Sequence, residues 1–243
     1  MSTEAIELWG HWGAPNPWKV CMVLEELGLP YTIHYRELSE VKNEDYLKIN
    51  PNGRLPAIKD PNSGLTLWES GAIILYLIDR YDLDEKLSYK TFPEKYLTQQ
   101  WLAFQISGSY LMDFCWSKHA DDPSGQAPYF GQATWFARFH SQKISSAIDR
   151  YVNEVFRVVG VLEKALEANG TGWLVGDRMT YADLSFVTWS SVANGLLKQL
   201  DKLAGFEEKF PRYTKWLKDM GSREAVQKIE DQMARGRAEH ALP

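Results

Sequence analysis

The 243-residue chain contains 44% hydrophobic and 24% charged residues, a composition typical of a globular protein rather than a disordered one. Its net charge of −5 argues against a nucleic-acid partner, because such proteins usually carry a basic surface. The longest apolar runs are too short to span a bilayer, and the first residues lack the basic and apolar regions of a signal peptide. Two cysteines cannot build a disulfide framework, so we expect a cytoplasmic protein. Because the apolar runs are short, we expect no membrane partner.

The first 35 residues predict a strand, a helix and a second strand. Residues 5–9 and 31–35 are the expected strands. Between them, Asn16 is a preferred N-cap, Pro17 is favoured at the first helical position, and Gly28 predicts the end of the helix. Apolar residues with helical spacing mark its inner face: Val20, Val23, Leu24 and Leu27. A helix joining two strands in about thirty residues is typical of a parallel pair.

The next 46 residues predict a hairpin followed by a helix. A short helix is expected near 44–49, and two prolines flank an expected turn in 50–56. The segments 57–60 and 65–68 lie on either side of a Pro-Asn-Ser-Gly turn and predict a β-hairpin. A second apolar helical stripe then ends at Tyr81, so residues 1–81 predict the order β-α-β-β-β-α.

The remainder of the chain has helical periodicity and no convincing strand. Residues 82–92 predict a linker, which sets the expected domains at 1–82 and 93–243. Two long helices are expected, Glu94–Ser117 and one through Ile144–Leu166, separated by the Pro- and Gly-rich segment Asp121–Gly131. Thr180 and Asp183 have the spacing of a capping box, with Asp in place of Glu. Shorter helices are expected near 198–204, 211–220 and 222–235.

Three local sequences, in this order and spacing, resemble the cytosolic glutathione transferase superfamily. Asn50–Ala57 resembles the loop that ends in a cis-proline, here Pro56, and Leu67–Ile73 resembles the glutamate-serine motif. Thr180–Leu184 resembles the capping box of the second domain. The resemblance implies an α/β thioredoxin-like N-terminal domain that binds glutathione, followed by an all-α C-terminal domain. Ala14–Val20 and Phe139–Tyr151 further resemble the fungal branch related to the prion-forming nitrogen-catabolite regulator, near the bacterial nu-type transferases.

Asn16 has two competing interpretations. The residue type and the following proline favour a simple helix cap. The resemblance instead implies a catalytic residue whose amide donates a hydrogen bond to the glutathione sulfur at the positive end of a helix. A neutral amide is a weaker activator of a thiol than a cation, so modest conjugation activity would be consistent with this role.

Five further residues are expected to hold glutathione. Ser70 begins a helix directly after a strand, so its N-terminus can take the γ-glutamyl carboxylate, and Glu69 can take the amine. The resemblance implies that the backbone of Leu55, before Pro56, pairs with the cysteinyl amide. Arg54 and Lys42 are candidates to neutralise the glycine carboxylate, although Lys42 is equally well explained as a surface lysine.

Other reactive residue types are expected to have no chemical role. Cys21 and Cys115 lack a CxxC partner, so we expect buried, inert thiols. We expect His11, which lies in a loop, to be solvated. No histidine has a metal-ligating spacing, so no metal is expected. The second-substrate pocket is expected between the domains, and its wall has these candidates: Gln105, Ser109, Tyr110, Met112, Phe114, Trp116, Trp135, Phe136 and Phe139.

The expected function is a detoxification-type transferase with glutathione as co-substrate and a hydrophobic small molecule as the second. A glutathione thiolate held by Asn16 would attack an apolar electrophile, a peroxide or a disulfide. The alternative is a catalytically weak glutathione- or ligand-binding regulatory protein, against which stands the absence of an Asn/Gln-rich tract. The resemblance also implies a homodimer.

Overall fold

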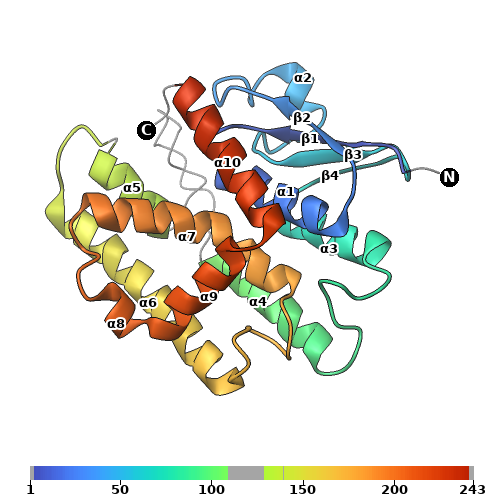
Figure 1. The fold of residues 1–243 in the computed structure, drawn as a ribbon. Helices are drawn as coiled ribbons and strands as arrows, with labels where there is room; N and C mark the ends of the chain where they lie inside the picture. Colours follow the sequence, from blue (N-terminus) through green and yellow to red (C-terminus); the bar gives the residue numbers. More distant parts are fainter. Residues whose placement is uncertain (1–2, 109–128, 139, 241–243) are drawn as a thin grey trace. The chain divides into compact units, whose positions relative to one another are not determined.

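The computed structural model describes residues 3–108, 129–138 and 140–240, and its contacts divide the chain into two compact units (Figure 1). One unit comprises residues 1–88 together with 222–243, and the other comprises residues 89–221. The C-terminal segment therefore groups with the N-terminal unit, whereas the sequence-based limits place it in the helical domain. The limits 1–82 and 93–243 for separate domains remain a prediction.

The N-terminal unit contains a four-stranded mixed sheet in the order β2-β1-β3-β4. Its elements in chain order are β1 (Ile6–Gly10), α1 (Pro15–Leu27), β2 (Tyr31–Tyr35), α2 (Glu44–Leu47), β3 (Ala57–Asp60), β4 (Leu65–Trp68) and α3 (Ser70–Tyr81). Strands β1 and β2 are parallel, and the other two pairs are antiparallel. The predicted order β-α-β-β-β-α is confirmed, because the turn residues and helical stripes that predict it are local signals, which the packing of this unit preserves.

Helix α1 begins earlier than the sequence predicts. Ala14 is the N-cap and Pro15 the first helical residue, so the predicted N-cap role of Asn16 is wrong. The φ of proline suits the first turn at Pro15 as well as at Pro17. In addition, the Ala14 N–H donates to the His11 carbonyl oxygen at 3.1 Å, which closes a turn just before the helix. Asn16 therefore lies inside the first turn.

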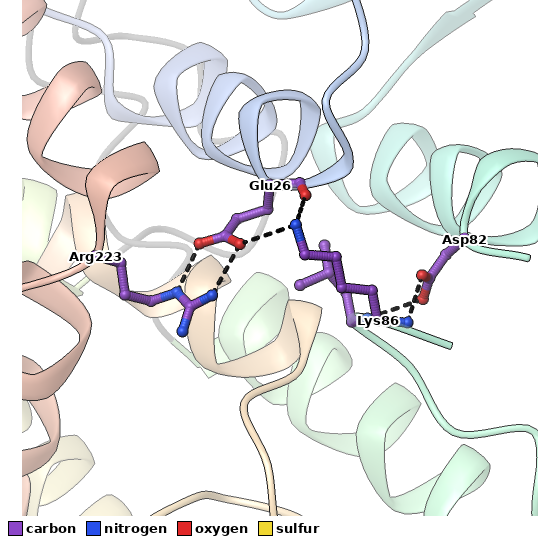
Figure 2. A network of polar contacts seen from close by, with 5 residues as sticks. Glu26, Asp82, Lys86 and Arg223 are labelled. Carbon is purple, nitrogen blue, oxygen red and sulfur yellow. Dashed lines mark hydrogen bonds and ion pairs between the residues drawn. The ribbon is translucent and has the colours of Figure 1, made fainter. Parts of the chain in front are cut away.

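The C-terminal helix α10 (Glu224–Glu239) packs beside α1 within this unit (Figure 1). Arg223, just before α10, donates from Nε and Nη2 to the two oxygens of Glu26 at 2.6 and 2.9 Å. Lys86 donates to the Glu26 carbonyl oxygen, and its Nζ lies 3.7 Å from Oε2 of the same residue (Figure 2). Because Glu26 is only 5% exposed, these two cations provide the compensation that a buried carboxylate requires.

The segment after α3 is fixed to this network by a second carboxylate, that of Asp82. Its Oδ1 accepts the Lys86 N–H at 2.7 Å (Figure 2). Its Oδ2 accepts the Leu87 N–H and the Ser88 hydroxyl at 3.0 and 2.6 Å. Asp82 therefore shapes the loop that presents Lys86 to Glu26. The polar network links α1, the end of α3 and the start of α10.

The described residues of the second unit form helices joined by loops, with no strand among them. Its helices are α4 (Glu94–Gly108), α5 (Tyr129–Arg138), α6 (Ser145–Asn169), α7 (Tyr181–Gln199), α8 (Phe206–Lys209) and α9 (Pro211–Gly221). The predicted all-α second part is confirmed for these residues. The expected continuation of α4 to Ser117, Cys115, and most of the Asp121–Gly131 separator lie outside the described residues. No helix was expected at α5.

Two boundaries in this unit show where local signals succeed and fail. Gly170 ends α6 in a left-handed conformation, with φ of 69°, as the sequence predicts. The expected helix at 198–204 is wrong: α7 continues to Gln199, and Asp201 then adopts φ of 54°, which interrupts the helix. The expected helices at 211–220 and 222–235 are present as α9 and α10.

The capping box of α7 forms, and tertiary contacts extend it. Thr180 donates to Oδ2 of Asp183 from its backbone N–H and its hydroxyl, at 2.8 and 2.9 Å. Oδ1 of Asp183 accepts the Leu174 N–H at 3.0 Å and Nε1–H of Trp216 at 2.9 Å. Burial raises the pKa of Asp183, and these four donors oppose that shift. One carboxylate thus joins α7, α9 and the loop before α7.

In the described part of the chain, no helix has the length and apolar character needed to cross a membrane.

Candidate functional site

The strand register brings predicted site residues to one edge of the sheet, namely the edge at which β1 and β4 end and β3 begins. Ala57 pairs with Trp9 of β1 and with Trp68 of β4, so the residue before β3 and the residue after β4 lie at the same edge. The Leu55–Pro56 peptide bond, which is cis, immediately precedes β3, and Glu69–Ser70 immediately follow β4. The loop that leads from β1 into α1 leaves the sheet at this edge too. The register therefore gathers the α1 N-terminus, Leu55–Pro56 and Glu69–Ser70.

The loop before β3 carries the two candidate cations. Nζ of Lys42 donates to the Asn52 carbonyl oxygen at 2.9 Å, so its stem lies across the turn at Gly53. Gly53 has φ of 57°, and a Cβ there would lie 2.6 Å from the Val41 carbonyl oxygen. Both the conformation and the space require glycine at this turn. No carboxylate pairs with the Arg54 guanidinium among residues 3–108, 129–138 and 140–240.

A buried cluster holds this loop against the sheet. Its members are Trp9, Val41, Tyr46, Leu55 and Ala57, with Leu38 and Ile49 partly buried beside them. The Arg54 carbonyl oxygen accepts hydrogen bonds from the Tyr46 hydroxyl and from Nδ2 of Asn50, both at 2.7 Å. The backbone at 54–55 is therefore fixed by packing and hydrogen bonds, as a site for an extended peptide-like ligand requires.

Asn16 is buried, with 5% of its surface exposed, at the second position of α1. Pro15 and Pro17 occupy the first and third positions and have no N–H, so Asn16 contributes the one backbone N–H of these three positions. Helix N-termini attract anions through such N–H groups and the helix dipole. Because two prolines reduce the backbone contribution here, the side-chain amide of Asn16 is a source of donors for an anion in addition to its own backbone N–H.

His11 is buried rather than solvated, which overturns the sequence-based expectation. It is 4% exposed, and its Nδ1 accepts the Gly13 N–H at 3.0 Å. Burial lowers the pKa of His11, while Glu37, whose Oε2 lies 3.8 Å from Nε2, opposes this shift. An Nδ1 that accepts a hydrogen bond cannot also hold a proton, so this geometry requires neutral imidazole. The sequence offered no signal for the burial of His11, because a lone histidine in a loop is usually exposed.

The residue before α3 adopts an unusual backbone conformation. Glu69 is the N-cap of α3 with φ of 71° and ψ of 113°, and Ser70 is the buried first residue of the helix. A non-glycine residue at such a φ costs about 1–3 kcal/mol, and strain of this kind concentrates at binding and catalytic sites. The sequence could not reveal the strain, because glutamate does not favour positive φ.

Replacing Glu69 with glycine is expected to stabilise the protein and to weaken glutathione binding. Glycine adopts φ of 71° readily, so the free energy of unfolding should rise by about 1 kcal/mol, but the carboxylate that would hold the ligand amine is lost. Glu85→Gly is the matched control, because Glu85 also has positive φ, 55°, and lies outside the candidate site. Denaturant unfolding and calorimetric titration should show stabilisation in both variants and weaker binding only at Glu69. Unchanged binding in Glu69→Gly would remove Glu69 from the site.

Cys21 and the remaining candidates are placed as follows. Cys21 is fully buried in α1, and burial raises the pKa of its thiol, so it is not a nucleophile at neutral pH. Among the described residues, no group of histidine, cysteine and carboxylate side chains is arranged to hold a metal. Five candidates for the second-substrate pocket lie in 109–128, and Phe139 also lies outside the described residues. That pocket remains a prediction.

Comparisons with known proteins agree with this architecture. The model of the glutathione S-transferase N-terminal domain matches residues 4–79, and the model of the C-terminal domain matches residues 134–230. A glutathione S-transferase-like protein, gedE of Aspergillus terreus, is 42% identical over 232 residues, covering 92% of this chain and 93% of the relative.

Two solved structures illustrate the range of related proteins. Ure2p5 of Phanerochaete chrysosporium, cocrystallised with 1-(S-glutathionyl)-2,4-dinitrobenzene, is 37% identical with a TM-score of 0.81 and covers 98% of both chains. The nitrogen regulation fragment of the yeast prion protein Ure2p is 36% identical with a TM-score of 0.77, covering 94% of this chain and 97% of the fragment. With both domain models matched and these identities over nearly its full length, the chain belongs to the glutathione S-transferase family, among its fungal and Ure2-type members.

Proposed function

We propose that the protein binds glutathione at the edge formed by the ends of β1, β3 and β4, and that Asn16 stabilises its thiolate for attack on a second substrate. The observation that carries the proposal is the convergence, by strand register, of the α1 N-terminus, Leu55–Pro56 and Glu69–Ser70. Each of these segments supplies a different kind of partner for a peptide that carries two carboxylates, an amine and a thiol.

The proposed contacts follow from the chemistry of each residue. Ser70, at the buried N-terminus of α3, binds the γ-glutamyl carboxylate, and Glu69 binds the neighbouring amine. The backbone of Leu55 pairs with the cysteinyl amide as an added strand would. Arg54 and Lys42 neutralise the glycine carboxylate. Lys42 already donates to Asn52, so Arg54, with no carboxylate partner among the described residues, is the stronger candidate of the two.

Asn16 supplies the activation. A cysteine-type thiol ionises near pH 8.5, and lowering its pKa by about two units requires about 2.7 kcal/mol of preferential stabilisation of the thiolate. A hydrogen bond to a charged group contributes about 1.5–3 kcal/mol, so one amide donor near a helix N-terminus provides most of this amount. The related glutathione transferase Ure2p5 was cocrystallised with 1-(S-glutathionyl)-2,4-dinitrobenzene, which supports conjugation as one reaction of this protein.

A substrate panel tests the proposal. Wild-type protein is assayed with glutathione and, in turn, chlorodinitrobenzene, cumene hydroperoxide and a small mixed disulfide. In the first reaction sulfur bonds to the ring carbon, chloride leaves with its electron pair, and the thiol proton goes to solvent. Turnover above the uncatalysed rate with any of the three supports the proposal, and the preferred substrate identifies the reaction. Absence of turnover with all three, in protein that binds glutathione, contradicts it.

A regulatory function is the second candidate. The related fragment of Ure2p is described as a nitrogen regulation fragment, and it shares this fold over 94% of the chain. In that case glutathione binding would persist without turnover, which is the negative outcome of the panel.

The proposal includes a cytosolic homodimer. Strand β4 is an edge strand, and Leu65 and Trp68 on it are each 37% exposed, which leaves apolar surface for a second copy to cover. Light scattering should give twice the monomer mass, and cell fractionation should recover the protein in the cytosol.

A further inference from the structure

Trp12, in the loop between β1 and α1, lies between β2 and α10. Its indole stacks on Tyr35 at the end of β2, with ring centroids 3.6 Å apart and an interplanar angle of 16°. It also stacks on His240, just after α10, at 5.5 Å and 22°. Gly236 of α10 closely approaches the same ring, because a Cβ at this position would lie 2.0 Å from Cε3 of Trp12 and 2.4 Å from Cδ2.

Gly236 is therefore required for its size. Its φ is not in the left-handed region, so no backbone conformation demands glycine there. Glycine inside a helix is less stable than alanine, and α10 retains it where the indole occupies the space of a side chain. Tyr35 stacks closely on the same indole, so a shift of the ring away from α10 would disturb that stack.

The backbone of Trp12 is attached to the start of α1. Its carbonyl oxygen accepts Nε1–H of Trp18 at 3.0 Å, and Trp18 is almost completely buried. On either side of Trp12, the His11 imidazole accepts the Gly13 N–H and the His11 carbonyl accepts the Ala14 N–H. Residues 11–14 thus form a closed turn that leads directly into the first turn of α1. Displacement of the indole would move this turn.

We propose that Trp12 is a positioning residue: stacked on Tyr35 and closely approached by Gly236, it sets the place of the 11–14 turn and thereby of Asn16 relative to the glutathione sulfur. The C-terminal helix α10 thus contributes to the site without contacting glutathione. This inference rests on the proposed function, because it concerns the residue that activates the thiol. Activation through a single hydrogen bond is sensitive to such placement, since bond strength falls steeply with distance and angle.

The test adds one methyl group at Gly236. Gly236→Ala must push the indole aside, and we expect the pKa of the bound glutathione thiol, followed by thiolate absorbance, to rise by about one unit, with about a threefold lower kcat at neutral pH. Gly195→Ala is the matched control: Gly195 lies in α7, and a Cβ there meets no atom within 4 Å. The control should leave the thiol pKa and kcat unchanged. If Trp12 had a merely structural role, Gly236→Ala would leave both unchanged as well.

A double-mutant cycle isolates the contact. In a Trp12→Leu background the smaller side chain leaves room for the added methyl group, so Gly236→Ala should have no further effect on the thiol pKa. The proposal is overturned if Gly236→Ala shifts this pKa equally in both backgrounds or in neither. If Gly236→Ala does not fold, Trp12→Leu alone must still raise the thiol pKa. An ordinary thiol pKa in the wild-type complex would instead overturn the proposed function, which keeps the two failures distinct.

Discussion

Asn16→Ala is expected to bind glutathione and to lose most of its turnover. Asn16 is buried in the first turn of α1, where Pro15 and Pro17 remove two of the backbone donors that would otherwise stabilise an anion. Removing a donor to a charged sulfur loses about 1.5–3 kcal/mol, which corresponds to a decrease of about 10- to 100-fold in the rate of the chemical step. The other proposed ligands, Glu69, Ser70 and Arg54, remain in place, so affinity should change by less than about threefold.

The pH dependence separates activation from folding. In wild type, the rate should rise with pH until the lowered thiol pKa is passed and then level off, because only the thiolate reacts. In Asn16→Ala that rising limb should move to higher pH by about one to two units. Asn16→Asp preserves the shape but replaces the amide donors with a negative charge, so its limb should move further still. An unshifted pH profile in both variants would show that another group activates the thiol.

Asp183→Ala is expected to produce the largest loss of stability. Four donors converge on this fully buried carboxylate: the Leu174 N–H, the Thr180 N–H and hydroxyl, and the Trp216 indole. Removing it leaves buried donors unpaired, each costing about 1–3 kcal/mol, and eliminates the cap of α7. Allowing for relaxation and water entry, we expect the free energy of unfolding to fall by about 3–5 kcal/mol.

Denaturant unfolding followed by tryptophan fluorescence measures this loss. The matched control is Asp149→Ala, because Asp149 is more than half exposed and forms a surface ion pair with Lys202 at 3.2 Å. Such pairs contribute about 0–1 kcal/mol, so the control should unfold almost as wild type does. Glutathione binding should persist in folded Asp183→Ala, since the proposed ligands lie in the other unit. A loss below about 1 kcal/mol would contradict the role of the network.

The sequence by itself determined the features that depend on near neighbours. Gly28 ends α1 with φ of 67°. Asp183 completes the capping box of α7 with Thr180, which lies three residues before it. The β3–β4 hairpin follows in the same way from the Pro-Asn-Ser-Gly turn at 61–64. These signals are reliable because every atom involved lies within a few residues, so distant packing has little opportunity to override them. The same near-neighbour motifs carried the resemblance to the glutathione transferase family.

Tertiary structure decided how those elements are used. The first turn of α1 includes Asn16 because a turn at His11–Ala14 places the N-cap earlier than residue preferences do. His11 is buried and Glu69 is strained, and neither state is written in the residue type. Arg223 pairs with Glu26, which is 197 residues away in the sequence, and α10 belongs to the N-terminal unit. Such contacts depend on which surfaces the fold brings together, and the free energy of burying and pairing those surfaces outweighs local preference.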